Sequence, residues 1–155
     1  MHAKPFVPLL LAGIVLTSAG VAHADREDHD SRARGPFEFA LIGDTPYVNG
    51  SDPGATYPPF DRLVDAINRE RRLQWVLHAG DIKNGSTLCS DALYPDRLAR
   101  FAAFSKPLVY TPGDNEWTDC HRLNNGQYQP LERLAKLREV LFPTPGATLG
   151  SGSLS

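Results

Sequence analysis

The sequence predicts an α/β fold in which three mainly parallel strands alternate with flanking helices. Three short apolar runs each end in Gly-Asp, at Gly43-Asp44, Gly80-Asp81 and Gly113-Asp114. The second and third aspartates follow the preceding one by 37 and 33 residues, which leaves room for one helix between successive strands. In such a sheet, ligand sites lie beyond the carboxyl ends of the strands. We therefore expect the three aspartates to converge at one edge.

The first strand and the first helix have the clearest patterns. Residues 37–42 (FEFALI) alternate so that Phe37, Phe39 and Leu41 share one face of a strand. Pro58-Pro59 opens a helix, because proline is favoured at the first helical positions. Its apolar residues recur at i, i+3, i+4 and i+7. These residues are Phe60, Leu63, Val64 and Ile67.

The rest of the chain repeats this alternation. A second strand over 74–79 precedes a helix over about 95–104, and a third strand over 107–111 precedes a polar loop and a helix over 130–142. The apolar residues expected to pack these two helices are Leu98, Phe101, Ala102, Leu131, Leu134, Leu137 and Leu141. Residues 143–155 have little to bury and are expected to form a flexible tail.

The N-terminal residues indicate export. An apolar stretch over 6–21 ends in Ala22-His23-Ala24, which predicts a signal peptide over 1–24 and a periplasmic or secreted protein. An uncleaved anchor is the alternative, although the stretch is short for a membrane span of about 20 residues. After cleavage we expect no stable span. Residues 25–35 form a polar linker, so the folded domain is expected over 36–142.

Charge and cysteine content narrow the function classes. The chain has 16 Lys and Arg against 18 Asp and Glu, so no basic patch for nucleic acid or anionic lipid is expected. Cys89 and Cys120 lie in loops that each follow a Gly-Asp block. An even pair in an exported chain predicts a disulfide, with thiolate ligation of a metal as the lesser alternative.

The three Gly-Asp blocks resemble the first three motifs of the calcineurin-like metallophosphoesterase family. The family pattern is D-x-H, then G-D-x-x-[DN], then G-N-H-[DE]. Secreted bacterial members with a G-D-N-E-W-T-D-C-H block are the most similar, and residues 113–121 carry that block. The resemblance implies a βαβαβα half of a metallophosphoesterase sandwich, and it implies metal-dependent hydrolysis of a phosphate ester, either a small molecule or a phosphoprotein.

The resemblance also implies a two-metal site for Mn, Fe, Zn or Mg. By position in the motifs, Asp81 would bridge the two ions and Asp44 would bind one of them. Asn84 and the Asp114-Asn115 pair would serve the other ion. Carboxylate and amide oxygens suit hard divalent cations, and two such ions can neutralise a phosphate and activate water.

Two departures from the family pattern leave alternatives open. Pro46 replaces the histidine of D-x-H, so the first ion must lose a ligand or borrow one, with Tyr47 as a candidate. In the third block, Asp114 stands at the place of the metal-binding asparagine and Asn115 at that of the catalytic histidine. A shift of one residue would make Asn115 the ligand instead, and the sequence does not choose between the two.

The histidines and one lysine complete the candidates. His78 lies inside a strand and is expected to be a satisfied, partly buried residue. His121, beside Arg122, is a candidate for phosphate contact, with a plain loop role as the alternative. Lys83 would either contact phosphate or balance the carboxylates.

The later family motifs, a single His and then G-H-x-H, have no counterpart in this sequence. We interpret the chain as a fragment of a longer enzyme or a truncated product, whose sheet presents an uncovered edge or face. A non-catalytic exported binding protein derived from the same fold is the alternative.

Overall fold

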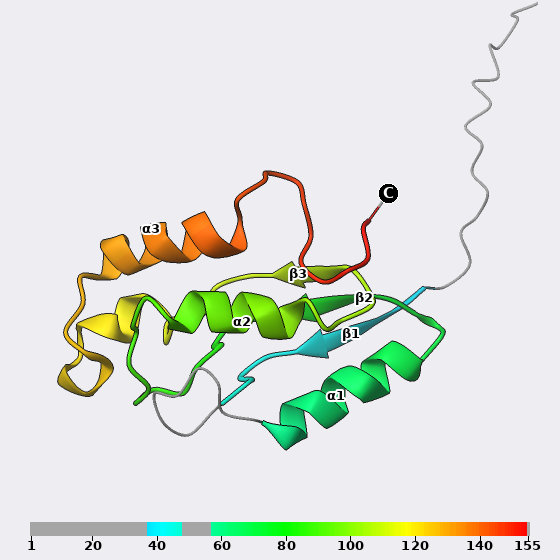
Figure 1. Ribbon diagram of the computed structural model, residues 1–155, viewed down its shortest axis with the longest axis horizontal. Helices are drawn as coiled ribbons and strands as arrows, with labels where there is room; N and C mark the ends of the chain where they lie inside the picture. The colour runs from blue at the N-terminus through cyan, green and yellow to red at the C-terminus, as the bar shows by residue number, and fades with distance from the viewer. Residues whose placement is uncertain (1–36, 48–56, 155) are drawn as a thin grey trace, which may run out of the picture. The chain divides into compact units, whose positions relative to one another are not determined.

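The computed structural model describes residues 37–47 and 57–154. The expected signal peptide, the linker over 25–35 and part of the loop after the first strand lie outside these residues. Figure 1 shows strands and α-helices alternating along the chain. In chain order the elements are β1 (Glu38–Ile42), α1 (Pro58–Arg69), β2 (Leu73–His78), α2 (Leu93–Phe101), β3 (Leu108–Tyr110), the 3-10 helices η1 (Thr118–His121) and η2 (Leu123–Asn125), and α3 (Pro130–Leu141).

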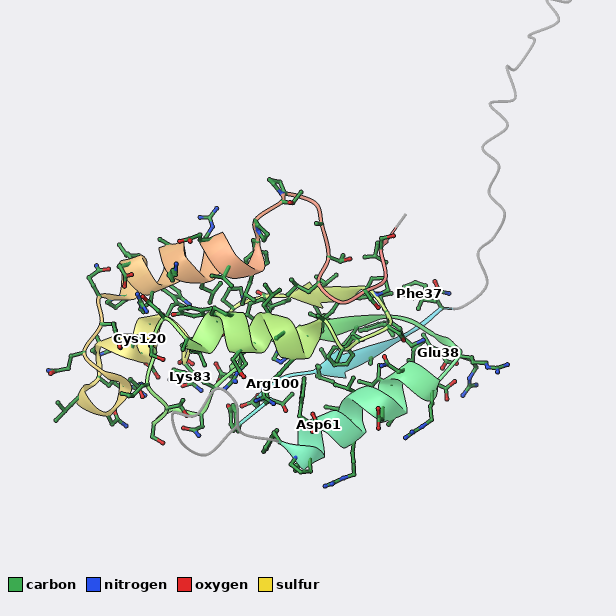
Figure 2. The ribbon with its side chains drawn as sticks, in the orientation of Figure 1. Phe37, Glu38, Asp61, Lys83, Arg100 and Cys120 are labelled. Carbon is green, nitrogen blue, oxygen red and sulfur yellow. A yellow bond between two sulfur atoms is a disulfide. The ribbon has the colours of Figure 1, made fainter. Side chains whose placement is uncertain are left out.

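The three strands form one parallel sheet in the order β1-β2-β3, which confirms the predicted α/β class. Ile42 pairs with His78, and His78 pairs with Tyr110, so the strands end level with one another. The three Gly-Asp turns therefore leave the sheet at the same edge. Figure 2 shows Lys83 and Cys120 at this end of the domain and Phe37 and Glu38 at the start of β1, at the opposite end.

The helix α1 follows the predicted pattern closely. Two prolines occupy its first turn, and Phe60, Val64 and Ile67 are buried. Its C-terminal end is closed by the backbone N–H of Glu70, which donates to the carbonyls of Ala66 and Ile67. Burial of one apolar stripe against the sheet is what stabilises a helix of this length.

The helices α2 and α3 differ from expectation in which residues they bury. Ala102 lies beyond the end of α2 and is exposed, and Leu131 in the first turn of α3 is 65% exposed. Two arginines, Arg97 and Arg133, are buried instead. Arg97 donates to the carbonyl of Ile82. The start of α3 lies against η1 and the loop after β2. Polar partners therefore decide which residues of these two helices are buried.

Arg133 joins α3 to the loop after β2 through its buried guanidinium. Its guanidinium donates to the carbonyl of Cys89 at 2.8 Å, pairs with Asp91 at 2.8 Å and lies 4.7 Å from the centre of the Tyr128 ring. A guanidinium can be buried when its donors find carbonyl and carboxylate partners and its plane lies on an aromatic ring. Leucine periodicity could not predict this arrangement.

Among the described residues, the core lies on one face of the sheet. Residues of all three α-helices pack with Val76, Leu108 and Tyr110 in a single buried cluster. On the other face, Phe37, Phe39 and Leu41 are 56%, 42% and 65% exposed. Within the described part of the chain, no element packs over this face of the sheet.

The residues after α3 make ordered backbone contacts where a flexible tail over 143–155 was expected. Leu149 forms an antiparallel bridge with Leu108, with N···O distances of 2.6 and 2.8 Å. The backbone N–H of Ser151 donates to the carbonyl of Phe104. This segment satisfies part of the free edge of β3 by backbone hydrogen bonds, which need no apolar side chains.

None of the described helices has the length and apolar character needed to cross a membrane.

Candidate functional site

The turns after β1 and β2 hold their aspartates in an unusual backbone conformation. Asp44 has φ 57° and Asp81 has φ 56°, in the left-handed region that residues with side chains seldom adopt. The N–H of Asp44 donates to the carbonyl of Gly80 at 3.1 Å, which ties the first turn to the second. Such conformations persist where surrounding contacts enforce them, and they are often found at functional sites.

The turns after β2 and β3 are in direct backbone contact. A Cβ atom on Gly80 would lie 2.4 Å from the nitrogen of Gly113, and one on Gly113 would lie 2.1 Å from Oδ1 of Asp81. Both distances are far inside van der Waals contact, so only glycine fits at either place. The glycines of the Gly-Asp motif therefore allow the carboxylate of Asp81 to lie against the third turn.

The environment of Asp81 raises its pKa. Burial raises its pKa, the N–H of Asn115 at 3.4 Å opposes that rise, and the negative charges of Asp114 and Asp44 add to it. Asp44 and Asp114 thus both lie within electrostatic reach of Asp81, and the sequence predicted that the three would meet at one edge. A bound cation would relieve this repulsion.

Tyr47 lies beside Asp44. Its hydroxyl donates a hydrogen bond of 2.9 Å to Oδ1 of Asp44. Burial raises the pKa of Tyr47 well above its ordinary value, and the hydrogen bond to Asp44 adds to that rise, so the phenol is neutral and acts as a donor. The structure therefore places Tyr47 against the carboxylate whose expected histidine neighbour is replaced by Pro46.

Glu116 connects the second and third turns, and sequence reasoning did not include it among the candidate residues. Its Oε1 accepts hydrogen bonds from the N–H of Asp81 at 3.2 Å, the N–H of Gly113 at 2.7 Å and the hydroxyl of Tyr110 at 2.7 Å. The side chain is fully buried, and burial raises its pKa. Its Oε2 has no hydrogen-bond partner among the described residues. The acidic fourth place of the G-N-H-[DE] motif is the signal that could have identified it.

Lys83 is a buried cation near the carboxylates of Glu116, Asp119 and Asp81. It is fully buried and donates to the carbonyl of Asn84 at 3.0 Å. Burial lowers the pKa of Lys83 to about 8, while the charges of Glu116, Asp119 and Asp81 oppose that decrease. The side chain does not reach solvent and lies within electrostatic reach of three carboxylates. Of the two roles that the sequence left open, this burial favours the balance of charge.

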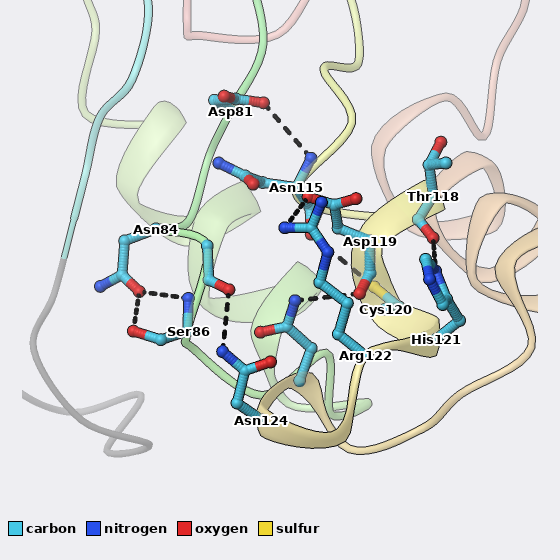
Figure 3. Close-up of polar contacts among 12 residues, drawn as sticks. Asp81, Asn84, Ser86, Asn115, Thr118, Asp119, Cys120, His121, Arg122 and Asn124 are labelled. Carbon is cyan, nitrogen blue, oxygen red and sulfur yellow. Dashed lines mark hydrogen bonds and ion pairs between the residues drawn. The ribbon is translucent and has the colours of Figure 1, made fainter.

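The two candidate asparagines are placed differently. Oδ1 of Asn84 accepts from both the N–H and the hydroxyl of Ser86 at 2.9 Å, within its own loop (Figure 3). Asn115 lies next to Asp81, and its carbonyl oxygen is 3.7 Å from Sγ of Cys89 and 3.8 Å from Sγ of Cys120. Cys89 and Cys120 form the predicted disulfide. Both sulfur atoms of the disulfide thus lie against the carbonyl oxygen of Asn115.

Neither described histidine points into the acidic edge. His78 is fully buried, its Nε2 donates to the carbonyl of Thr45 at 2.7 Å and its Nδ1 accepts from the N–H of Gly80 at 3.2 Å. This confirms His78 as a satisfied buried residue. His121 is exposed, and its Nδ1 lies 2.7 Å from the carbonyl of Thr118, on the side of η1 away from Asp81 in Figure 3.

The acidic edge fits a divalent cation in the kind of donor and the sign of charge. It offers carboxylate and amide oxygens, which hard cations prefer. Burial and neighbouring negative charges also disfavour the ionised form of Asp81, which a cation would stabilise. The side chains of this edge do not form a complete set of metal ligands, however. Among the residues that the structure describes, no three His, Cys, Asp or Glu side chains are grouped to hold a metal ion.

These features define an α/β protein with an acidic site at the carboxyl ends of its parallel strands. A model of the calcineurin-like phosphoesterase family (Metallophos) matches residues 37–154, and the chain belongs to this family. The match covers all the described helices and strands after Phe37 and includes the three Gly-Asp turns. Comparison with curated proteins and with solved structures gives no significant match.

Proposed function

We propose that the chain acts as a metal-dependent phosphoester hydrolase at the edge formed by its three Gly-Asp turns. Family membership supports the reaction class. The observation that carries the proposal for this chain is the meeting of the three acidic turns at one edge: the N–H of Asp44 donates to the carbonyl of Gly80 at 3.1 Å, and the N–H of Asn115 lies 3.4 Å from Oδ1 of Asp81. An edge that concentrates negative charge in this way is suited to hold cations.

The proposed oxygen donors are Asp44, Asp81, Asp114 and the side-chain amide of Asn115. Divalent ions held there would neutralise the phosphate ester and lower the pKa of a bound water. Asn84, the other ligand expected from the resemblance, already accepts two hydrogen bonds from Ser86, and we give it a supporting role in the loop.

The remaining residues of the edge act by positioning. Tyr47 holds Asp44 through its hydroxyl, and Glu116 holds the backbone of Asp81. Asn115 stands where the family has a histidine, and its amide can donate a hydrogen bond to a substrate oxygen but cannot supply a proton. Protonation of the leaving oxygen must therefore come from another group or from water.

Hydrolysis of p-nitrophenyl phosphate by the full chain in the presence of Mn²⁺ tests this proposal. We expect Mn²⁺-dependent turnover that Asp81→Asn abolishes. Asp65→Asn, an exposed position on α1, is the matched control and should leave the rate unchanged. Undiminished turnover by Asp81→Asn would contradict the assignment of Asp81.

A second candidate function, metal or phosphate binding without catalysis, is favoured by one observation. Of the described histidines, His78 has both ring nitrogens engaged in the core and His121 is bonded to a loop carbonyl. The edge therefore lacks an imidazole acid among the described residues. Binding of Mn²⁺ and inorganic phosphate without turnover of any aryl phosphate would support this alternative.

We also propose that the protein is exported to the periplasm or the exterior. The disulfide between Cys89 and Cys120 supports an oxidising compartment, because structural disulfides are rare in reducing ones. Cell fractionation with an antibody against the chain tests this, and recovery of the chain only in the cytoplasm would contradict it.

A further inference from the structure

The acidic edge groups Asp44, Asp81 and Asp114, and a basic side chain that faces solvent would help the divalent ions proposed there to attract an anionic substrate. Lys83 contributes positive charge, but its side chain is completely buried and donates to a backbone carbonyl. The side chain of Arg122, in contrast, is 50% exposed.

Arg122 is held in place by a buried carboxylate. Its Nη1 lies 2.6 Å from Oδ2 of Asp119, whose side chain is only 8% exposed. Asp119 is itself fixed: its N–H donates to the carbonyl of Asp114 at 3.0 Å, and its carbonyl accepts from Nδ2 of Asn125 at 2.9 Å. The adjacent Cys120 is joined to the loop after β2 by the disulfide. The guanidinium is therefore held at a defined position, while the Arg122 side chain as a whole is half exposed.

The guanidinium also lies on the side of η1 that faces the acidic edge. Figure 3 shows the Arg122 side chain extending toward Asn115, with Asp119 beside it and Asp81 beyond. His121, the preceding residue, is turned to the carbonyl of Thr118 instead.

We propose that Arg122 is the phosphate-recognition residue of this site, that its guanidinium pairs with non-bridging oxygens of the substrate phosphoryl group, and that Asp119 is the positioning residue that orients it. This inference rests on the proposed phosphoesterase function and extends it. A guanidinium has five N–H donors in a planar fork, and the pair with Asp119 employs those on one nitrogen. The fork matches two oxygens of one phosphate at once.

The inference also specifies the substrate class. A phosphate monoester presents three non-bridging oxygens and up to two negative charges, whereas a diester presents two oxygens and one charge. A fixed guanidinium therefore gains more from a monoester than from a diester. We infer that the site prefers phosphate monoesters and that Arg122 is the source of much of this preference.

Direct binding of inorganic phosphate to the full chain, measured by titration calorimetry, tests the inference without requiring catalysis. We expect Arg122→Met to weaken phosphate binding at least tenfold and Arg122→Lys to weaken it less, because lysine keeps the charge but not the fork. Arg138→Met, at an exposed position on α3, is the matched control and should leave phosphate affinity unchanged. The thermal midpoint of Arg122→Met should stay close to that of the wild type, which separates lost recognition from lost folding.

The outcomes separate this inference from the proposed function. Arg122-dependent phosphate binding in a chain that hydrolyses no ester would support the inference and contradict the proposed function. Hydrolysis of p-nitrophenyl phosphate with phosphate affinity and KM unaltered in Arg122→Met would overturn the inference and leave the proposed function standing. If the chain hydrolyses esters, Arg122→Met should lose more kcat/KM on p-nitrophenyl phosphate than on bis(p-nitrophenyl) phosphate. Equal losses on the two substrates would also overturn the inference.

Discussion

The backbone N–H of Asp81 donates a hydrogen bond of 3.2 Å to the Glu116 carboxylate, which joins the turn after β2 to the turn after β3. The same oxygen accepts from the N–H of Gly113 and from the hydroxyl of Tyr110. One buried side chain thus fixes the geometry of two of the three Gly-Asp turns. The acidic edge depends on Glu116 even though this residue need not touch any ligand.

Replacement of Glu116 should therefore destabilise the fold strongly. Glu116→Ala leaves two backbone N–H groups and one hydroxyl without an acceptor, and we expect a loss of about 3 to 5 kcal/mol in the free energy of unfolding. Glu116→Gln keeps an oxygen acceptor and should cost much less, about 1 kcal/mol. Urea unfolding measures both. An Ala variant as stable as the Gln variant would contradict this role.

The disulfide between Cys89 and Cys120 should contribute to both stability and site geometry. It closes a loop with a sequence separation of 31, for which chain entropy gives about 4 kcal/mol. We expect the double variant Cys89→Ser, Cys120→Ser to lose about that amount, and we expect a reductant to destabilise only the wild type. An equal response of both proteins to dithiothreitol would show that the effect does not come from this bond.

His78 should make the fold sensitive to mild acid. Burial lowers its pKa below the ordinary value, so the folded state resists protonation while the unfolded chain takes up a proton near pH 6.5. The free energy of unfolding should therefore fall as the pH decreases below about 6.5. Urea unfolding between pH 7.5 and 5.5 measures the slope. His78→Gln, which cannot be protonated, should reduce that slope even if its own stability is lower, and an unchanged slope would contradict the assignment.

The uncovered face of the sheet gives a prediction about Leu41. This side chain is 65% exposed, so Leu41→Lys should change the free energy of unfolding by less than about 0.5 kcal/mol. Val76→Lys, at a fully buried position on the opposite face, is the contrasting variant and should prevent stable folding. A large loss for Leu41→Lys, above about 2 kcal/mol, would mean that another part of the full chain covers this face.

The sequence predicted the fold well because its signals are local. The Gly-Asp turns marked the strand ends, and the spacing of Phe60, Val64 and Ile67 marked α1 and its buried stripe. The burial of α3 was predicted less well, because its leucines are periodic all along the helix. Only contacts between distant segments reveal that Leu131 faces solvent while Arg133 is enclosed by Cys89, Asp91 and Tyr128.

The same difference applies to the candidate site. The motifs predicted that Asp44, Asp81 and Asp114 share one edge, because parallel strands end together. They did not predict that Lys83 is buried, which does not follow from residue type or spacing. The acidic fourth place of the third motif marks Glu116 as a candidate, but not its hydrogen bonds to two turns. The side of η1 on which His121 and Arg122 lie depends on the backbone of one short 3-10 helix. No periodic pattern in the sequence predicts the side of a short 3-10 helix on which a side chain lies.

Binding of Mn²⁺ to the full chain, followed by electron paramagnetic resonance of the free ion, tests whether the Gly-Asp turns form one cation-binding edge. We expect the wild type to bind Mn²⁺, and we expect Asp44→Asn, Asp81→Asn and Asp114→Asn each to weaken binding, with Asp81→Asn having the largest effect. Asp65→Asn should bind like the wild type. Mn²⁺ affinity that is the same in the wild type and in all three edge variants would show that the turns do not form such a site.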